Sequence, residues 1–300
     1  MYKTFRFINA RDGIMRGIFL FCAVFSVFAL GCICIFLFVS GVPFIGKIGL
    51  ANFFGATWNL HDGSYGILSM IAASLYVTAL ATVIGVAVGL SAAINLYKFC
   101  PKKIVPPVRQ MINLLAGIPS VIYGLFGMIV IVPFLRDYVS HNGVGYGILA
   151  ASLVLSVMIL PTIVSVSLDA LNAVPKSYHE GALALGATKA QSVFLVMLPA
   201  AKSGIFAAVV LSIGRAVGET MAVIMVIGGS PAMPKSLFQS VRTLTANIAM
   251  GATELHGDAA TALVSTGVVL FFFTLLLNVS FSLLKGGAGS EGKRQKKTDP

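Results

Sequence analysis

Long apolar stretches alternate with short polar segments along almost the whole chain. Six of these stretches reach the roughly 20 apolar residues that a membrane-spanning helix needs. They are Gly17–Gly41, Ile67–Tyr97, Ile112–Leu135, Tyr146–Leu171, Ser203–Gly228 and Ala262–Leu284. The second is longer than a bilayer requires, so we expect it to tilt or to extend into water. The pattern predicts an all-α polytopic membrane protein with six transmembrane helices.

The composition supports this class. Hydrophobic residues make up 57% of the 300 residues and charged residues 10%, whereas soluble domains have about 45–50% and about 25%. The first apolar stretch is longer than the roughly 7–15-residue core of a signal peptide, and no A-x-A-like cleavage site follows it. We therefore expect it to be a retained anchor.

Lysine and arginine predict the orientation. With the N-terminus in the cytoplasm, sixteen of these residues fall in cytoplasmic segments, and four fall in outer loops. This bias places both termini in the cytoplasm. It also accounts for the net charge of +11 without nucleic-acid binding. The resulting domains are 1–66, with the first helix and an outer loop; a membrane-spanning core at 67–284 that includes the cytoplasmic loop 172–202; and a basic tail at 285–300. We expect that tail to be disordered and to lie along anionic lipid headgroups.

The cytoplasmic loop carries helix-start and helix-end signals. Ser177 and Glu180 have the three-residue spacing of a capping box, in which each side chain satisfies a backbone N–H. Gly186 permits the left-handed turn that ends a short helix. Thr188 and Gln191 repeat the capping pattern. The loop therefore predicts two short helices joined by a turn, which is a shape suited to docking another molecule.

Two charged residues lie within the fifth stretch. Arg215 falls near its middle, where an isolated charge costs between about 2.5 and about 17 kcal/mol. Glu219 follows four residues later, on the same face of a continuous helix. The two residues form either a structural ion pair or a site on a hydrophilic pathway, where the guanidinium would suit an oxyanion. Gly214 and Gly218 would let a neighbouring helix approach closely.

The third stretch contains a proline close to its start. Pro119 removes one backbone hydrogen bond and leaves polar groups available. Such a broken helix either lines a cavity or forms a simple kink, with close helix packing at Gly124 and Gly127.

Several function classes are disfavoured by missing motifs. The four cysteines form no CxxC pair and the four histidines no HExxH motif, so we expect neither a metal nor a cofactor. No phosphate-cradling GxxxxGK[ST] loop is present, so energy must come from an ion gradient or from a partner. Asp169, His179 and Glu180 form the only loose group that a membrane-embedded enzyme could use. Capping explains Glu180 better than catalysis does.

The cytoplasmic loop resembles the EAA signature of ABC-importer permeases, which reads E-A-A, three residues, G, nine residues, I-x-L-P. The residues in register are Glu180, Ala182, Gly186, Leu198 and Pro199. Gly181 stands in place of the first Ala and Val196 in place of the Ile. Pro199 cannot donate a backbone hydrogen bond and is expected to end or bend the second helix.

Two further segments resemble the phosphate-specific permeases of this superfamily. They are LAGIPSVIYGLFG at Leu115–Gly127 and GRAVGETMAV at Gly214–Val223. The second is closer to the PstC type than to its PstA partner. The resemblance extends roughly from Ile67 to Leu284. A permease for sulfate, molybdate or tungstate is the alternative within the superfamily.

The resemblance implies a type I ABC importer in the cytoplasmic membrane, in which this chain is a permease and not an enzyme. A homologous PstA-type permease would share the path, two cytoplasmic ATPase subunits would receive the loops, and an extracytoplasmic binding protein would deliver phosphate. The implied coupling residues are Ser177, Glu180, Ala182, Gly186, Leu198 and Pro199. Arg215 would be a transient stop for the anion, and Glu219 would balance it when the path is empty. The outer segment 231–258 would contact the binding protein. A gradient-driven transporter, from a different class, would need neither the docking loop nor the ATPases.

Overall fold

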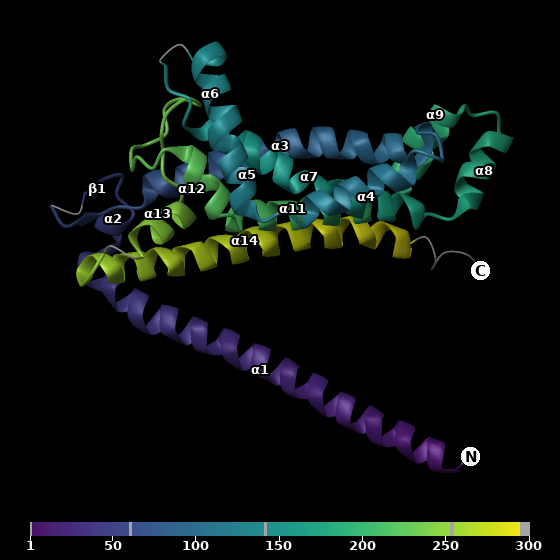
Figure 1. The fold of residues 1–300 in the computed structure, drawn as a ribbon, viewed down its shortest axis with the longest axis horizontal. Coiled ribbons are helices and arrows are strands. Elements are labelled where there is room, and N and C mark those ends of the chain that lie inside the picture. The colour runs from purple at the N-terminus through teal and green to yellow at the C-terminus, as the bar shows by residue number, and fades with distance from the viewer. Residues whose placement is uncertain (1, 60–61, 141–142, 253–254, 295–300) are drawn as a thin grey trace.

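Most of the long helices of the protein run side by side along its longest dimension, and the N-terminal helix diverges from them (Figure 1). The structure is a computed structural model that describes residues 2–59, 62–140, 143–252 and 255–294, with side chains over 15–59, 62–140, 143–252 and 255–280. A two-stranded antiparallel hairpin lies at one end of the bundle, and the short helix α8 (Lys176–Ala184) lies at the other end (Figure 1). We refer to these as the hairpin end and the α8 end.

The elements follow one another in the order below. The hairpin strands are β1 (Trp58–Asn59) and β2 (Ser64–Tyr65). The α-helices are α1 (Tyr2–Ile48), α2 (Leu50–Phe53), α3 (Leu68–Ile94), α4 (Val105–Ala116), α5 (Ser120–Phe126), α6 (Val132–Phe134), α7 (Ile148–Asn172), α8 (Lys176–Ala184), α9 (Lys189–Gln191), α10 (Leu198–Ala200), α11 (Lys202–Gly218), α12 (Met221–Ile227), α13 (Leu244–Gly251) and α14 (Asp258–Arg294). Turns of π-helix are η1 (Asn95–Phe99), η2 (Gly127–Ile131), η3 (Leu135–Val139) and η4 (Ser192–Met197).

Five helical segments in the described part of the chain are long and apolar enough to cross a membrane, and a bent pair of helices brings the total to six. The five are Met15–Ile48, Leu68–Phe99, Ser120–Val139, Ile148–Asn172 and Asp258–Ser280. The bent pair joins Lys189–Ala200 to Lys202–Gly218 at an angle of 68°. Six apolar stretches were predicted, and the third and fifth differ most from their predicted bounds.

Helix α7 forms the centre of the bundle. Its side chains Leu155, Ile159 and Ile163 are almost completely buried. Helix α3 approaches it closely because a β-carbon at Gly85 would lie 2.7 Å from Ile159, and one at Gly89 would lie 2.8 Å from Ile163. A helix that is apolar on every face is buried by its neighbours, as α7 is here.

The third span is interrupted rather than continuous. Helix α4 ends at Ala116 and α5 begins at Ser120, with Pro119 in an extended conformation between them. The predicted range Ile112–Leu135 therefore covers parts of two helices. Pro119, directly before α5, has no backbone N–H and cannot continue the hydrogen bonds of α4. The Tyr123 hydroxyl donates to the Leu115 carbonyl across the interruption at 2.7 Å.

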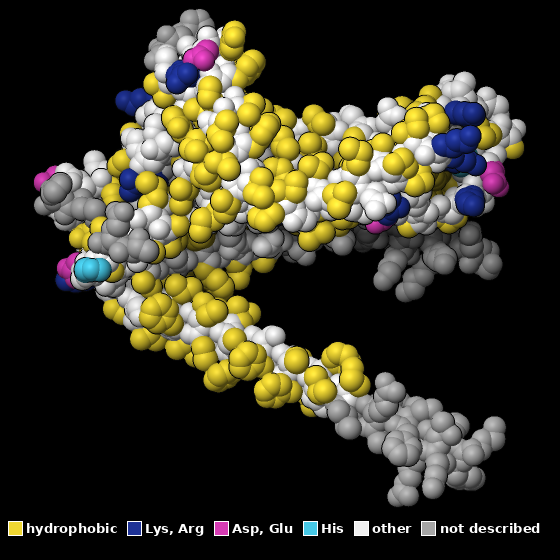
Figure 2. Space-filling view, in the orientation of Figure 1, with side chains coloured by type: hydrophobic (Ala, Val, Ile, Leu, Met, Phe, Trp, Pro, Cys, Tyr) yellow, Lys and Arg dark blue, Asp and Glu magenta, His cyan; other side chains and the backbone are white. Residues whose placement is uncertain are grey.

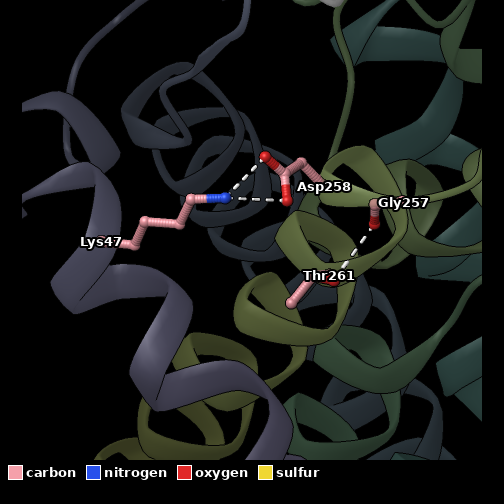
Figure 3. A network of polar contacts seen from close by, with 4 residues as sticks. All are labelled: Lys47, Gly257, Asp258 and Thr261. Carbon is pink, nitrogen blue, oxygen red and sulfur yellow. Dashed lines mark hydrogen bonds and ion pairs between the residues drawn. The ribbon is translucent and has the colours of Figure 1, made fainter.

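Helix α1 packs against α14 through its C-terminal part near the hairpin end and diverges from the bundle toward its N-terminal end (Figure 1). The Ser265 hydroxyl donates to the Gly41 carbonyl at 2.9 Å. Figure 3 shows the Lys47 ammonium donating to both carboxylate oxygens of Asp258, at 3.0 and 2.8 Å. This pair is exposed, and such pairs stabilise a protein by about 0–1 kcal/mol. The ion pair therefore contributes little to holding the two helices together.

The polar segment after α12 folds back into the hairpin end instead of forming a plain surface loop. Leu244 and Ala246 of α13 are fully buried, and Asn247 is 1% exposed. The Ser74 hydroxyl of α3 accepts a hydrogen bond from the backbone N–H of Leu244 at 3.0 Å. Polarity predicted that this segment does not span the membrane, but its burial depends on this tertiary contact.

The C-terminal tail departs from the prediction of disorder. Helix α14 continues without a break to Arg294, while 295–300 lie outside the described residues. Nucleation is the costly step of helix formation, and the sixth span is already helical. Each further residue therefore adds a hydrogen bond without a new nucleation step.

The Ser74 contact generates a stability prediction. Replacing Ser74 by Ala leaves the buried N–H of Leu244 without a partner, which we expect to destabilise the protein by about 1–3 kcal/mol. The measurement is the thermal unfolding midpoint of the purified protein in detergent. Ser91→Ala is the control, because the exposed Ser91 hydroxyl bonds only to the Ala87 carbonyl of its own helix. Equal midpoints for the two variants would show that Ser74 does not hold α13.

Candidate functional site

The segments Leu115–Gly127 and Gly214–Val223 are far apart in sequence and meet in the fold. Helix α5 packs against α12. A β-carbon at Gly124 would lie 2.9 Å from the Ala222 α-carbon, and one at Gly127 would lie 2.8 Å from Val226. The predicted close packing at both glycines is confirmed, and the third span is also broken at Pro119.

The fifth span is interrupted at Glu219. Helix α11 ends at Gly218, and Glu219 has an extended backbone with φ −72° and ψ 130°. Its carboxylate accepts a hydrogen bond from the backbone N–H of Ala222 at 3.1 Å, at the start of α12. A carboxylate is stabilised at this position by the unpaired N–H groups and the dipole of the helix.

Of the two interpretations of Arg215 and Glu219, the structural ion pair is not formed in the described part of the chain. Helix α11 ends at Gly218, and Glu219 is its C-cap residue. Among the described residues, the ion pairs are Lys47–Asp258, Arg109–Asp169 and Arg136–Asp137, and Arg215 is in none of them. Glu219 acts on α12 instead.

Arg215 lies in the last turn of α11, where the helix dipole favours a cation. Its neighbours Ala216 and Val217 are buried, but Arg215 itself is exposed on the surface of this single chain. Its charge acts on the phenol of Tyr123, whose hydroxyl crosses the interruption of the third span. Arg215 is therefore close to both interruptions and free of a carboxylate partner within the described part of the chain.

Within the described chain, neither glycine beside Arg215 makes a contact that requires a glycine. A β-carbon at Gly214 would lie 3.8 Å from the Asn278 side-chain oxygen of α14, an ordinary van der Waals distance, and one at Gly218 would meet nothing within 4 Å. Gly218 precedes the interruption and faces open space.

The loop between α7 and α11 forms a helix, a turn and a second helix, as predicted. The predicted capping box of Ser177 and Glu180 is wrong, because α8 begins at Lys176 with Pro175 as its N-terminal boundary and no side-chain cap. Pro175 has φ −55° and ψ 136°, so it starts the helix ahead of Ser177. Ser177 and Glu180 are therefore inside the helix and exposed.

Gly186 ends α8 in the left-handed conformation, with φ +87°. Its N–H donates to the Leu183 carbonyl at 3.0 Å, and the Ala187 N–H donates to the Ala182 carbonyl at 3.1 Å. This pair of bonds is the Schellman motif, which satisfies the last carbonyls of a helix. The sequence-based prediction for Gly186 is confirmed.

The second helix of the loop has the predicted capping box. The Gln191 N–H donates to the Thr188 hydroxyl at 3.2 Å, and the Thr188 N–H donates to the Gln191 side chain at 2.8 Å. The π-helix η4 follows, and Pro199 lies in the short helix after it. The chain then bends by 68° at Ala201, two residues beyond Pro199. Leu198, close to the bend in sequence, packs against a buried cluster that includes Leu171 and Val193.

His179, which the sequence placed only in a loose group with Asp169 and Glu180, links the two helices of the loop. The His179 ring nitrogen Nδ1 lies 2.6 Å from the Ser192 hydroxyl, and Ser192 is fully buried. Burial lowers the pKa of His179, as do the charges of Lys98 and Lys189, while Glu180 raises it. Spacing alone offers no signal for this contact, because thirteen residues separate His179 from Ser192.

Helix α8 has no buried side chain, and Leu185 beside it is 91% exposed. Lysine and arginine side chains gather at this end of the molecule, whereas hydrophobic side chains cover its middle (Figure 2). An apolar side chain held out by an ordered turn, beside cations, is suited to contact with another protein. In the described part of the chain, no cluster of three metal-ligating side chains occurs.

Comparison with known proteins identifies the family. The pattern of the family described as "Binding-protein-dependent transport system inner membrane component" matches residues 85–286, which is more than half of the chain. The chain belongs to this family. The permease is thus a multi-pass membrane subunit of a transporter and not itself an enzyme. Membership of this family argues against the alternative of a gradient-driven transporter.

Relatives match most of the permease. The probable ABC transporter permease protein YqgH of Bacillus subtilis (strain 168) is 42% identical over 270 residues, which are 85% of this chain and 86% of that protein. The phosphate transport system permease protein PstC of Mesorhizobium japonicum is 34% identical over 293 residues, 91% of this chain and 90% of that protein.

Solved structures share the fold. A permease chain of the MetNI methionine ABC transporter, in an inward-facing conformation, has a TM-score of 0.58 at 23% identity and covers 72% of this chain and 93% of that one. A chain of a bacterial ABC transporter involved in alginate import has a TM-score of 0.57 at 16% identity, with 87% and 95% covered. The fold is that of type I ABC importer permeases.

The His179 contact predicts a pH dependence. Because the folded protein lowers the pKa of His179 below its usual value of about 6.5, the contact stabilises the protein above that pH and is lost as the pH falls through the lower, folded pKa. We expect His179→Gln to lower the thermal midpoint at pH 7.5 by more than it does at pH 5. His256→Gln is the control, since that ring contacts only the adjacent Leu255 carbonyl. An effect of His179→Gln that is the same at both pH values would contradict this role.

Proposed function

We propose that this permease carries inorganic phosphate across the cytoplasmic membrane as part of an ATP-driven importer. The observation that carries the proposal is Arg215, an exposed guanidinium without an ion-pair partner among the described residues, beside two interrupted spans. A guanidinium binds tetrahedral oxyanions through parallel hydrogen bonds. Relatives of PstC type, which align with nearly the whole chain, support phosphate as the anion.

The α8 end would face the cytoplasm. Helix α1 begins and α14 ends on the side of α8 in Figure 1, so both chain ends and the loop share one side. The excess of lysine and arginine in these segments favours the cytoplasmic side. The hairpin end would then face outward, toward an extracytoplasmic phosphate-binding protein.

The loop at the α8 end would dock an ATPase subunit. Ser177, Glu180 and Gly186 are exposed there, Ala182 is partly buried, and Leu198 and Pro199 lie at the bend into α11. The Schellman motif and the capping box hold each helix of the loop together, so a push on α8 would reach α11 through the bend at Ala201. Two ATPase subunits would be needed, one for this chain and one for a homologous permease of PstA type.

Glu219 would shape the anion path without neutralising Arg215. Its carboxylate is occupied by the N–H of Ala222, so it would hold the interruption open while the guanidinium remains available. A single cation is a weak stop, and conduction requires sites that release the ion.

Arg215→Gln should reduce phosphate uptake by at least about tenfold in cells that carry the variant in place of the chromosomal copy, because the path loses its cation. Membrane abundance is checked by immunoblot, and sulfate uptake should stay normal. Arg136→Gln is the control, because that guanidinium pairs with its neighbour Asp137 and is exposed. Normal phosphate uptake by Arg215→Gln would remove this residue from the mechanism, and loss of the protein itself would favour a structural role.

Gly186→Val should weaken the stimulation of ATPase activity by phosphate-loaded binding protein. The left-handed conformation costs a residue other than glycine about 1–2 kcal/mol, although no atom lies within 4 Å of the added β-carbon. Gly181→Ala is the control, because Gly181 lies inside α8, also faces open space, and has no positive φ. Full stimulation in the Gly186→Val complex would show that the angle of this turn is not used in coupling.

A further inference from the structure

Two consecutive glycines form a tight turn directly after α12, and a later segment of the chain pairs with the backbone there. Gly228 and Gly229 have φ of +91° and +85°. The Gly229 N–H donates to the Val241 carbonyl at 3.0 Å, and the Val241 N–H donates to the Ile227 carbonyl at 3.2 Å. The next residue, Arg242, is thereby placed beside the turn.

The guanidinium of Arg242 is fixed but has no counter-ion. Its Nε donates to the Gly229 carbonyl at 2.8 Å, and one terminal nitrogen donates to the Asn247 side-chain oxygen at 3.2 Å. Within the described part of the chain it belongs to no ion pair. Burial lowers the pKa of Arg242 from its usual value, but a guanidinium stays charged. A partly desolvated cation without an anion is costly, so such a residue marks a place that an anion can occupy.

The side chain beside it also lacks a partner. Asn247 is 1% exposed, and its amide nitrogen has no hydrogen-bond acceptor. Buried polar groups are nearly always paired, so an orphaned N–H₂ group requires an explanation. The Asn247 oxygen already faces the guanidinium. The two residues therefore offer unused N–H donors next to each other, which is the chemistry that an oxyanion satisfies.

This pair of residues is connected to the interruption of the fifth span. The Thr245 hydroxyl, two residues before Asn247, donates to the Glu219 carbonyl at 3.1 Å. The Thr243 and Thr245 hydroxyls lie 3.2 Å apart. An anion at Arg242 would thus be held against the segment that contains Glu219, at the hairpin end of the same span as Arg215.

We propose that Arg242 and Asn247 form an outer oxyanion subsite, at which phosphate is held before it passes the interruption at Glu219. This inference rests on the proposed transport of an oxyanion and adds a site on the outer side of Arg215. Two neutral contacts orient the guanidinium, and its remaining donors are free to bind the anion. The site has one cation, so it binds weakly enough to release its occupant.

Asn247→Asp separates this role from a purely structural one. The new carboxylate would pair with Arg242 at the position of the present oxygen, 3.2 Å away, which preserves the clamp on the turn and fills the site with a built-in anion. We expect phosphate uptake by the complete importer in proteoliposomes to fall by about tenfold or more. The thermal midpoint of the complex should be unchanged or higher.

Gln239→Glu is the matched control. It adds the same charge to the same outer segment, and the oxygen that accepts from the Lys235 N–H at 2.8 Å is retained. We expect its uptake to stay within about twofold of wild type, because the charge does not contact the guanidinium. Uptake by Asn247→Asp that equals that of the control would overturn the subsite. If the wild-type importer carries sulfate and not phosphate, the proposed cargo fails, and the same comparison with sulfate still tests the subsite.

A second measurement keeps the inference testable if Asn247→Asp does not assemble. Ser230→Cys, next to Gly229, is introduced into the importer after Cys22, Cys32, Cys34 and Cys100 are replaced by serine. An anionic thiosulfonate reagent should modify this cysteine faster than a cationic one, and phosphate should slow the anionic reagent. Equal rates that phosphate leaves unchanged would rule out an anion site at Arg242.

Discussion

Every backbone N–H and C=O group that an interrupted span exposes within a bilayer must find a partner inside the protein, and both interrupted spans of this permease are built around that requirement. In the third span, the Tyr123 hydroxyl reaches the Leu115 carbonyl across the interruption at Pro119. In the fifth, the Glu219 carboxylate receives the N–H of Ala222, and the Glu219 carbonyl receives the Thr245 hydroxyl. Side chains replace the missing helical bonds, so irregular backbone is tolerated beside a polar path.

Mutual packing of these two spans follows from small residues. Gly124 and Gly127 allow α5 to lie directly against α12, which brings the two interruptions and Arg215 into one region. Without a hydrophobic driving force between helices in lipid, such close contact is what holds spans together. The same principle operates between α3 and α7 at Gly85 and Gly89.

The two ends of the bundle are ordered by different kinds of contact. At the α8 end, local hydrogen bonds give an ordered projection: a Schellman motif at Gly186 and a capping box at Thr188. At the hairpin end, order also comes from a long-range contact, that of Ser74 with Leu244, which are 170 residues apart. A loop ordered by local bonds moves as a unit, whereas a segment buried by distant contacts is held in place. This contrast agrees with the proposed docking of an ATPase at the α8 end and the proposed entry of the anion at the hairpin end.

Hydrophobic periodicity and composition by themselves determined the class of protein, the number of apolar stretches and most of their bounds, because the bilayer sets helix length and polarity. Local signals also determined the left-handed conformation of Gly186 and the capping box of Thr188 and Gln191. The hydrogen bonds of both motifs form between residues close in sequence. The tertiary structure decided the rest. It placed the start of α8 at Pro175, ended α11 before Glu219, and buried α13. It also left Arg215 and Arg242 without carboxylate partners in the described part of the chain. A four-residue spacing brings two side chains onto one face of a helix. Whether they pair depends on what else each residue contacts, and contacts such as that of Thr245 with Glu219 come from residues far away in the sequence.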